Sequence, residues 1–282
     1  MNPETARRTH RALEPVHAMV YFTAEPQEEY LALGLDVKAN RALGYFPARA
    51  ACLGVTPWQV VHALFHGFSP LAVQFGIAGV WETATPEAVL AARYRGADRA
   101  LTRLLGEVDL TEAVELATEA AAACSPYGRA LYAATAAVPA PDGPPHLQLW
   151  HALTLLREYR GDGHIAALVA AGITGLEAGV LHCALESTWT RKAWQATRAY
   201  SDDEWDAAEA SLVERDWLSE PGVLSASGTE RREAVEAATD VMGLAPWEAL
   251  GEARTARLVE LVKPLSRAVV DAGTFAKGPS LG

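Results

Sequence analysis

Apolar residues recur every three to four positions along most of the chain, the spacing of helices with one buried face. Short breaks rich in glycine and proline separate these stretches. Several breaks end in a helix-starting signature, a hydroxyl residue followed by proline, as in Thr56-Pro57 and Thr85-Pro86. The pattern predicts helices over residues 5–22, 25–34, 42–53, 57–66, from about 70, and over 88–105, 111–137, 147–159, 165–171, 176–186, 202–216, 229–242 and 246–271.

One segment departs from helical spacing. The helix predicted over 202–216 starts at Ser201 with an acidic first turn, the form of a capping box. A Glu-Pro-Gly turn at 220–222 and one short strand at 223–225 follow, and Gly228 precedes a long helix. A helix, a short hairpin and a closing helix form the second half of a winged helix-turn-helix. We therefore predict a winged-helix segment over 202–242 with a short β-wing.

A proline-rich stretch divides the chain. Residues 138–146, VPAPDGPPH, hold four prolines and one glycine, which is typical of a linker. We expect an N-terminal helical half over 1–137, a C-terminal half over 147–272 and a mobile tail over 273–282.

The two halves are weakly similar to each other. Residues 48–64 match residues 166–185 around a Gly-Val-Thr or Gly-Ile-Thr turn, and residues 83–92 match residues 199–208. Two interpretations remain open. The chain is either an internal repeat that folds as a single-chain pseudo-dimer of winged-helix units, or the shared small residues and helix breaks arise by chance.

Composition supports a mainly α fold. The chain has 55 alanines, and alanine is the best helix former. The net charge of −11 argues against broad affinity for nucleic acid. The sequence has no apolar run long enough for a membrane span and no apolar N-terminal signal core. Three distant cysteines, Cys52, Cys124 and Cys183, fit a reducing compartment, so we expect a cytoplasmic protein without membrane contact.

Several phrases resemble one protein family. LEPVHAMVYF (13–22), YFPARAACLG (45–54), LWHALTLLREYRGDGHIAALVAAG (149–172) and the following DDEW…WL…LSASG segment are similar to an actinobacterial family with a MarR-like winged helix-turn-helix. The high ratio of arginine to lysine and the alanine content fit a GC-rich genome. The resemblance covers roughly residues 5–265. It implies DNA binding, although a fold alone does not define a function.

The candidate recognition helix has the wrong charge for DNA. Residues 202–216 contain seven acids and one base, Arg215. A helix in the major groove faces phosphates and base edges, which acidic side chains repel. The helix over 88–105 is basic instead, with Arg95, Arg99 and Arg103 on one face. This face is either a solvated surface, a site for an anionic ligand or partner, or the one place where nucleic acid would bind.

The densest polar cluster lies between two apolar helical stretches at residues 157–164, REYRGDGH. In a structural interpretation, Gly161 ends one helix and Asp162 or Gly163 caps the next. In a functional interpretation, this turn directs His164 into a cavity as a general base, with Asp162 orienting the imidazole. Arg157 would then anchor a carboxylate or phosphate of the substrate.

Further candidates extend this predicted site. His151 precedes Arg157 on the same helix and is a second acid/base candidate. Arg49 and His17, from the first half, are candidate substrate-binding residues if the two halves form one pocket. His62 and His66 share a helical face in an HxxxH pattern, a weak metal site without an obvious third ligand. No haem or nucleotide motif is present, and the sequence assigns no cofactor.

Three functions remain open. The first is a helical protein that binds a small anionic or polar molecule, either as a binding protein or as an acid/base enzyme of specialised metabolism. The second is a MarR-like, ligand-responsive transcription regulator that binds DNA. The third is an interaction module in which the acidic helix over 202–216 docks a basic partner. The acidic recognition helix favours the first.

Overall fold

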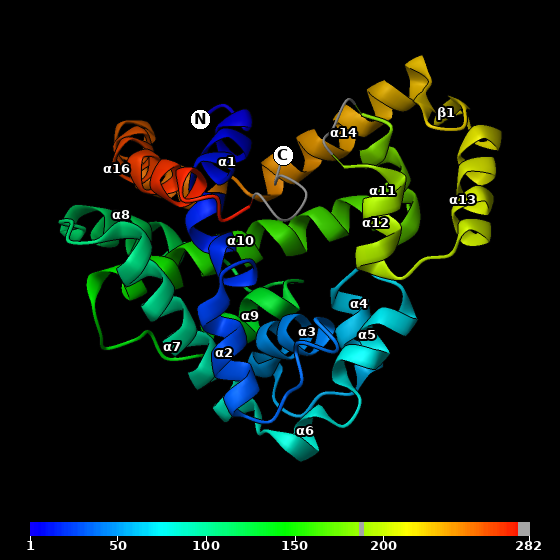
Figure 1. The fold of residues 1–282 in the computed structure, drawn as a ribbon. Helices are drawn as coiled ribbons and strands as arrows, with labels where there is room; N and C mark the ends of the chain where they lie inside the picture. Colours follow the sequence, from blue (N-terminus) through cyan, green and yellow to red (C-terminus); the bar gives the residue numbers. More distant parts are fainter. Residues whose placement is uncertain (186–188, 276–282) are drawn as a thin grey trace.

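Helix α10, Pro145–Ala170, runs through the middle of the molecule, and helices from the whole chain pack against it (Figure 1). The structure is a computed structural model that describes residues 1–185 and 189–275. The predicted mainly α class is confirmed, because one two-stranded sheet is the only sheet among these residues.

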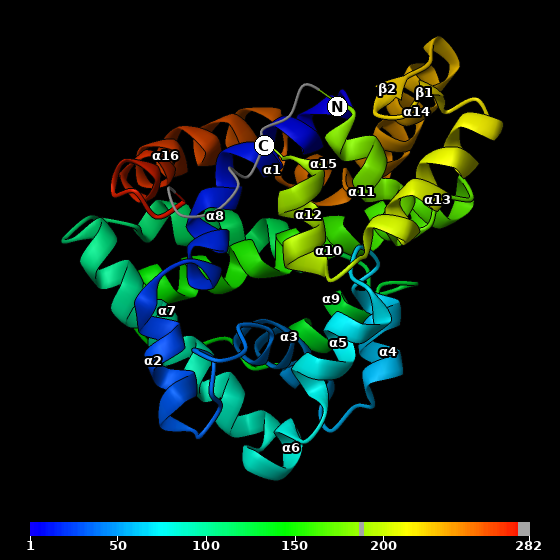
Figure 2. The same cartoon turned by 45° about the vertical axis from the view of Figure 1, so that its right-hand side comes forward.

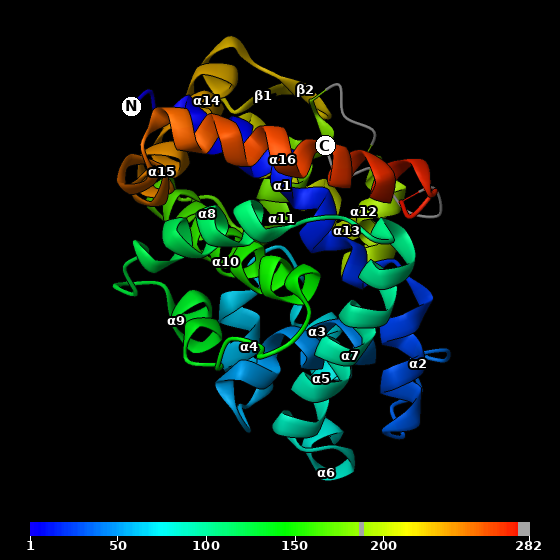
Figure 3. The ribbon, with the colours of Figure 1, turned by 90° about the vertical axis from the view of Figure 1, so that its left-hand side faces the viewer.

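The largest core surrounds the first half of α10. It combines apolar side chains of helices near both ends of the chain, which lie side by side in Figure 3. The helices that build it are α1 (Glu4–Ala18), the C-terminal half of α7 (Pro86–Leu105), α8 (Thr111–Ala122), α15 (Ala245–Leu250) and α16 (Glu252–Asp271). This core joins residues from both sides of the 138–146 stretch, and the division into two halves at that stretch stays a prediction.

A second layer lies below α10 in Figure 1. Two smaller cores hold it together, one between α2 and α7 and one among α3, α4, α5 and α9. The remaining elements of this layer are α2 (Ala24–Ala32), α3 (Ala42–Ala50), α4 (Trp58–Leu64), α5 (Pro70–Ile77), α6 (Val80–Thr83), α9 (Ala130–Ala136) and the 3-10 helices η1 (Met19–Tyr21) and η2 (Ala51–Leu53).

The segment predicted as a winged helix packs with neighbouring helices in a separate core around the end of α10 (Figure 2). Trp205 and Leu212 of α13 pack there with Trp217, Leu218 and Val235. Strands β1 and β2 pair antiparallel between α13 and α14; β2 lies at the predicted strand, and β1 was not predicted. The elements are α11 (Gly175–Cys183), α12 (Arg191–Arg198), α13 (Asp202–Glu214), β1 (Leu218–Glu220), β2 (Val223–Leu224) and α14 (Ala226–Met242).

Side-chain caps define the starts of six α-helices in the described part of the chain, namely α5, α7, α11, α12, α13 and α14. Ser69 and Thr85 accept a backbone N–H from the first turn of α5 and α7, with proline as the first helical residue. Thr174 and Ser201 form complete capping boxes with Glu177 and Glu204. These starts were predictable because the signal is local.

The predicted turn at residues 160–164 is wrong. Helix α10 continues through Gly161, Asp162 and Gly163 to Ala170. A Cβ atom on Gly163 would lie 2.8 Å from Nη1 of Arg129, so this glycine admits a crossing side chain rather than a turn. Glycine inside a helix costs about 1 kcal/mol relative to alanine, a cost that the dense packing around α10 outweighs.

Other boundaries differ by a few residues. Helix α4 ends at Leu64 and not at His66, and Gly251, with φ +83°, splits the predicted last helix into α15 and α16. Helix α11 ends at Cys183, short of the predicted 186, and residue 186 itself lies outside the described residues, as does most of the 273–282 tail.

The described residues contain no single helix that combines the length and the apolar character needed to cross a membrane. Helices α10 and α11 meet those criteria only when they are taken together, and they meet at a bend of 98°.

Candidate functional site

A cavity of about 410 Å³ lies where α10 meets α3, the loop after α4, α11, α12 and α14. This volume is within the range of small-molecule sites. Four of the six predicted catalytic and substrate-binding residues line it, namely Arg49, Arg157, Asp162 and His164. One wall is polar and belongs to α10 and α14. The other is aromatic and belongs to α3, the loop after α4, and the α12 region.

A buried ion-pair cluster forms part of the polar wall. Glu158 accepts hydrogen bonds from Nη2 of Arg49 at 2.7 and 2.9 Å and from Nη1 of Arg157 at 2.6 Å. The Glu158 side chain is 2% exposed. Burial by itself would raise the pKa of Glu158, but the charges of Arg157 and Arg49 lower it below its usual range. The two predicted anchors are thus joined by a carboxylate to which the sequence assigned no role.

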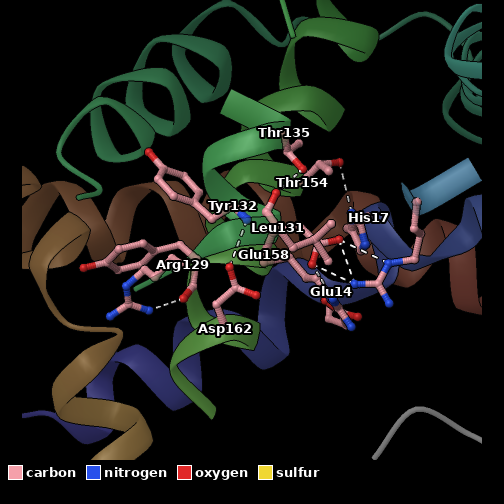
Figure 4. Close-up of polar contacts among 12 residues, drawn as sticks. Glu14, His17, Arg129, Leu131, Tyr132, Thr135, Thr154, Glu158 and Asp162 are labelled. Atoms are coloured by element: carbon pink, nitrogen blue, oxygen red, sulfur yellow. Dashed lines mark hydrogen bonds and ion pairs between the residues drawn. The ribbon is translucent and has the colours of Figure 1, made fainter. Parts of the chain in front are cut away.

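Asp162 binds the protein rather than an imidazole. Its Oδ2 accepts the backbone N–H of Tyr132 at 3.0 Å and so caps the start of α9 from a neighbouring helix (Figure 4). Burial raises the pKa of Asp162. The prediction that Asp162 or Gly163 caps a helix after a turn at Gly161 is therefore wrong, and Asp162 instead caps α9, a helix distant in sequence.

Thr239 orients His164, the role predicted for Asp162. The Thr239 hydroxyl donates to the carbonyl of Val235 at 2.8 Å, so it accepts from the Nδ1–H of His164 at 3.0 Å. This places the lone pair of the neutral imidazole on Nε2, at which no described residue makes a hydrogen bond. Burial lowers the pKa of His164, which keeps the ring neutral near pH 7.

His151 and His17 do not line this cavity. Thirteen residues of continuous helix separate His151 from His164, about 20 Å at 1.5 Å per residue. Nδ1 of His151 lies 2.6 Å from the Tyr94 hydroxyl, and burial lowers the pKa of His151 to about 4.

His17 has both ring nitrogens engaged. Nδ1 donates to Thr154, 3.1 Å away, and Nε2 accepts from Tyr21 at 3.2 Å. Figure 4 shows His17 on the far side of Glu158 from Asp162. Because neither ring nitrogen of His17 has a free lone pair, its hydrogen bonds indicate a structural role and not the role of a general base.

The HxxxH pair does not share a helical face, because α4 ends before His66. Nε2 of His62 donates to the Phe68 carbonyl at 3.1 Å and Nε2 of His66 to the Ile173 carbonyl at 3.0 Å. Within the described part of the chain, no three His, Cys, Asp or Glu side chains are grouped so that they could hold a metal ion.

The basic face of α7 is neutralised. Arg95, Arg99 and Arg103 are each about half exposed and form ion pairs of 2.5–3.0 Å with glutamates of α2. The partners are Glu25, Glu28 and Glu29. Arg93, on the same helix, is buried and donates to the Ala48 carbonyl. The charge pattern of the sequence is present, but every arginine in it has a partner.

In and next to the segment predicted as a winged helix, two packed helices, a hairpin and a closing helix follow one another. Helices α11 and α13 pack against each other, and the β1–β2 hairpin and α14 follow directly. A family model described as a helix-turn-helix family matches residues 6–276. The chain belongs to this helix-turn-helix family. No curated protein and no solved structure matches the chain.

This member of the helix-turn-helix family has an acidic α13. Asp202 and Asp206 are exposed and pair with Arg191 of α12, at 2.9 and 2.6 Å. The cation that pairs with the acidic surface of α13 is therefore a residue of the preceding helix, α12. The surface of α13 has the opposite sign to that of a helix that contacts phosphates.

The sequence analysis missed several cavity residues. Trp189, Trp194 and Arg198 line the cavity from the α12 region, for which no helix was predicted. A local signal in the sequence could have identified this helix. Thr190 caps α12, and Trp194 and Arg198 are four residues apart, which places them on one helical face.

Proposed function

We propose that this helix-turn-helix family member binds a small polar or anionic molecule in the cavity between α3, α10, α12 and α14. The observation that carries the proposal is the cavity of about 410 Å³ that has Arg49, Arg157, Asp162 and His164 in its lining. Two of these residues, Arg49 and Arg157, come from separate helices and share the carboxylate of Glu158, which is 109 positions from Arg49.

His164 is the acid/base candidate within this proposal. Its free Nε2 lone pair and its neutral state suit proton abstraction from a bound molecule near pH 7. Arg157 is 26% exposed, so its guanidinium has donors left for a ligand beyond the bond to Glu158. Asp162 supports the site by capping α9 and not by orienting the imidazole of His164.

Cavity filling tests the proposal. Ala178 lines the cavity from α11, and Ala178→Phe would occupy its space. Ala166→Phe, on an exposed position of α10, is the matched control. We expect native mass spectrometry of protein from its natural host to show a bound small molecule in the wild type and the control, and at least a tenfold lower bound fraction in Ala178→Phe. Absence of any bound molecule in all three, together with no thermal shift by a panel of organic acids, would reject the proposal.

The family membership favours a second candidate, a MarR-like transcription regulator that binds DNA. The α7 face is the candidate contact, because its ion pairs with α2 are solvent-exposed and contribute only about 0–1 kcal/mol each. A phosphate lattice can therefore compete with Glu25, Glu28 and Glu29 for the three arginines. Such a regulator would use the cavity as its ligand sensor.

Fluorescence anisotropy with a labelled DNA duplex tests this candidate. We expect binding that weakens at least tenfold between 25 and 200 mM salt, because contacts to several phosphates release counterions. The triple variant Arg95→Gln, Arg99→Gln, Arg103→Gln should lose it, whereas Arg254→Gln, an exposed arginine of α16, should not. No binding at 25 mM salt would rule the regulator out.

A further inference from the structure

Arginines surround the cavity, and one of them differs from the rest. Two share the carboxylate of Glu158, and a third lies 3.8 Å from Glu236 on its own helix. Around the fourth, Arg198, no described carboxylate lies within ion-pair distance. The four are Arg49, Arg157, Arg232 and Arg198.

Aromatic rings enclose the Arg198 guanidinium. Its Cζ lies 4.3 Å from the ring centre of Trp194, 4.8 Å from that of Trp189 and 4.9 Å from that of Phe68. All three rings also line the cavity. Stacking of this kind stabilises a cation and leaves the in-plane N–H donors directed past the rings.

The hydrogen bonds of Arg198 are incomplete. Nη1 donates to Thr197 at 2.7 Å, while Nε is buried without an acceptor. Burial lowers the pKa of Arg198, the sign of a cation that has lost water without gaining an anion. A buried cation with unused donors binds an oxyanion strongly, because the charge-assisted hydrogen bonds replace lost hydration.

The fold makes room for these rings. A Cβ atom on Gly179 would lie 2.3 Å from Nε1 of Trp194, so only a glycine on α11 lets the indole approach that helix so closely. His182 is a further ring of this wall, 5.6 Å from Trp194 between ring centres, and the planes of Trp189 and Trp194 meet at 70°. The wall therefore presents several ring faces and edges around the one guanidinium, a mostly apolar surface that complements an aromatic or aliphatic body.

We propose that Arg198, with Phe68, Trp189 and Trp194, forms an anion subsite of the cavity, and that the ligand is a largely apolar molecule with one carboxylate, sulfonate or phosphate group. The anionic group binds the guanidinium edge, and the apolar body packs along the aromatic wall toward His164. This inference rests on the proposed function and specifies the chemical class of its ligand.

A pair of dyes that differ in one anionic group provides the test. The probes are 8-anilinonaphthalene-1-sulfonate and N-phenyl-1-naphthylamine, which lacks the sulfonate, and both fluoresce in apolar sites. We expect Arg198→Gln to lower the affinity for the sulfonate at least tenfold and to leave affinity for the neutral dye within twofold. Arg198→Lys, which keeps the charge, should lose less than Arg198→Gln. Arg254→Gln, at a distant surface ion pair, is the control and should match the wild type.

The outcomes separate this inference from the proposed function. If Ala178→Phe blocks both dyes but Arg198→Gln leaves the sulfonate affinity unchanged, the cavity binds ligands and the anion subsite is wrong. If Arg198→Gln and Arg198→Lys weaken both dyes equally, Arg198 supports the fold of the wall and does not recognise charge, which also overturns the inference. If Ala178→Phe changes neither dye, the proposed cavity function fails with it.

Discussion

Two regions of the molecule contain arginine–glutamate ion pairs with the same distance between the charged atoms but with different exposure to solvent. On the outer face, Arg99 of α7 pairs with Glu28 of α2 at 2.7 Å, and both side chains are about half exposed. Beside the cavity, Arg49 pairs with Glu158 at the same distance, and both side chains are 6% exposed or less. The surface pair can be replaced by water and salt, whereas the buried pair has no substitute.

This difference explains why a count of charges misleads. Arg95, Arg99 and Arg103 form a basic stripe on α7, yet each has a glutamate partner on α2. Among the four cavity arginines, Arg198 is the one with no described carboxylate within ion-pair distance, although α12 is a short helix with only three cations. The position of the carboxylates, and not the number of arginines, determines where an anion can bind.

Removal of the shared carboxylate should have the largest effect. Glu158→Ala leaves Arg49 and Arg157 buried, adjacent and without a counter-charge. We expect a loss of about 3–5 kcal/mol in the free energy of unfolding, measured by urea denaturation followed by circular dichroism. Glu28→Ala, which removes the surface partner of Arg99, is the control and should cost less than about 1 kcal/mol. Equal losses in the two variants would remove the distinction between the regions.

We expect an intermediate, pH-dependent effect on the free energy of unfolding from Glu14, a carboxylate without an arginine ion-pair partner among the described residues. Oε2 of Glu14 on α1 has no hydrogen-bond partner in the described structure, and burial raises the pKa of Glu14 to about 7. The wild type must ionise this group in the folded state, so its stability falls as pH rises from about 4.5 to 7 and the loss is complete above that range.

Glu14→Gln cannot ionise and avoids this loss. We expect the variant to gain about 3 kcal/mol relative to wild type between pH 5 and pH 8, from urea denaturation at both pH values. Glu4→Gln, an exposed acid on the same helix, should show a difference near zero. A Glu14→Gln difference that is the same at both pH values would mean that Glu14 is ionised throughout this range.

Local signals in the sequence predicted the helix starts and the hairpin. Caps such as Thr85-Pro86 and Ser201 act within one turn, so the residues that define them are neighbours in the chain. The continuity of α10 was not predictable in this way. Gly161-Asp162-Gly163 has the composition of a turn, and only the crossing of Arg129 and the capping of α9 by Asp162 show why it is helical.

The sequence predicted those residues of the site that lie close together on one helix. Arg157 and His164 lie two turns apart on α10, so one polar cluster in the sequence found both. His151 failed as a partner because the continuous helix carries it away. Thr239, which orients His164, and Arg198 come from distant segments, and their roles depend on contacts that spacing along the chain does not report.

The smallest effect is expected at the surface pairs themselves. Arg99→Gln removes two ion pairs with α2, at 2.7 and 3.0 Å, but Glu28 is exposed to solvent and Glu29 keeps its ion pair with Arg95. We expect a loss below about 1 kcal/mol at low ionic strength that disappears in 1 M salt, because the Debye length there is about 3 Å. Parallel urea denaturation of Glu158→Ala in 1 M salt should keep most of its loss. A salt-resistant loss above about 2 kcal/mol in Arg99→Gln would mean that the α2–α7 pairs stabilise the fold as buried pairs do.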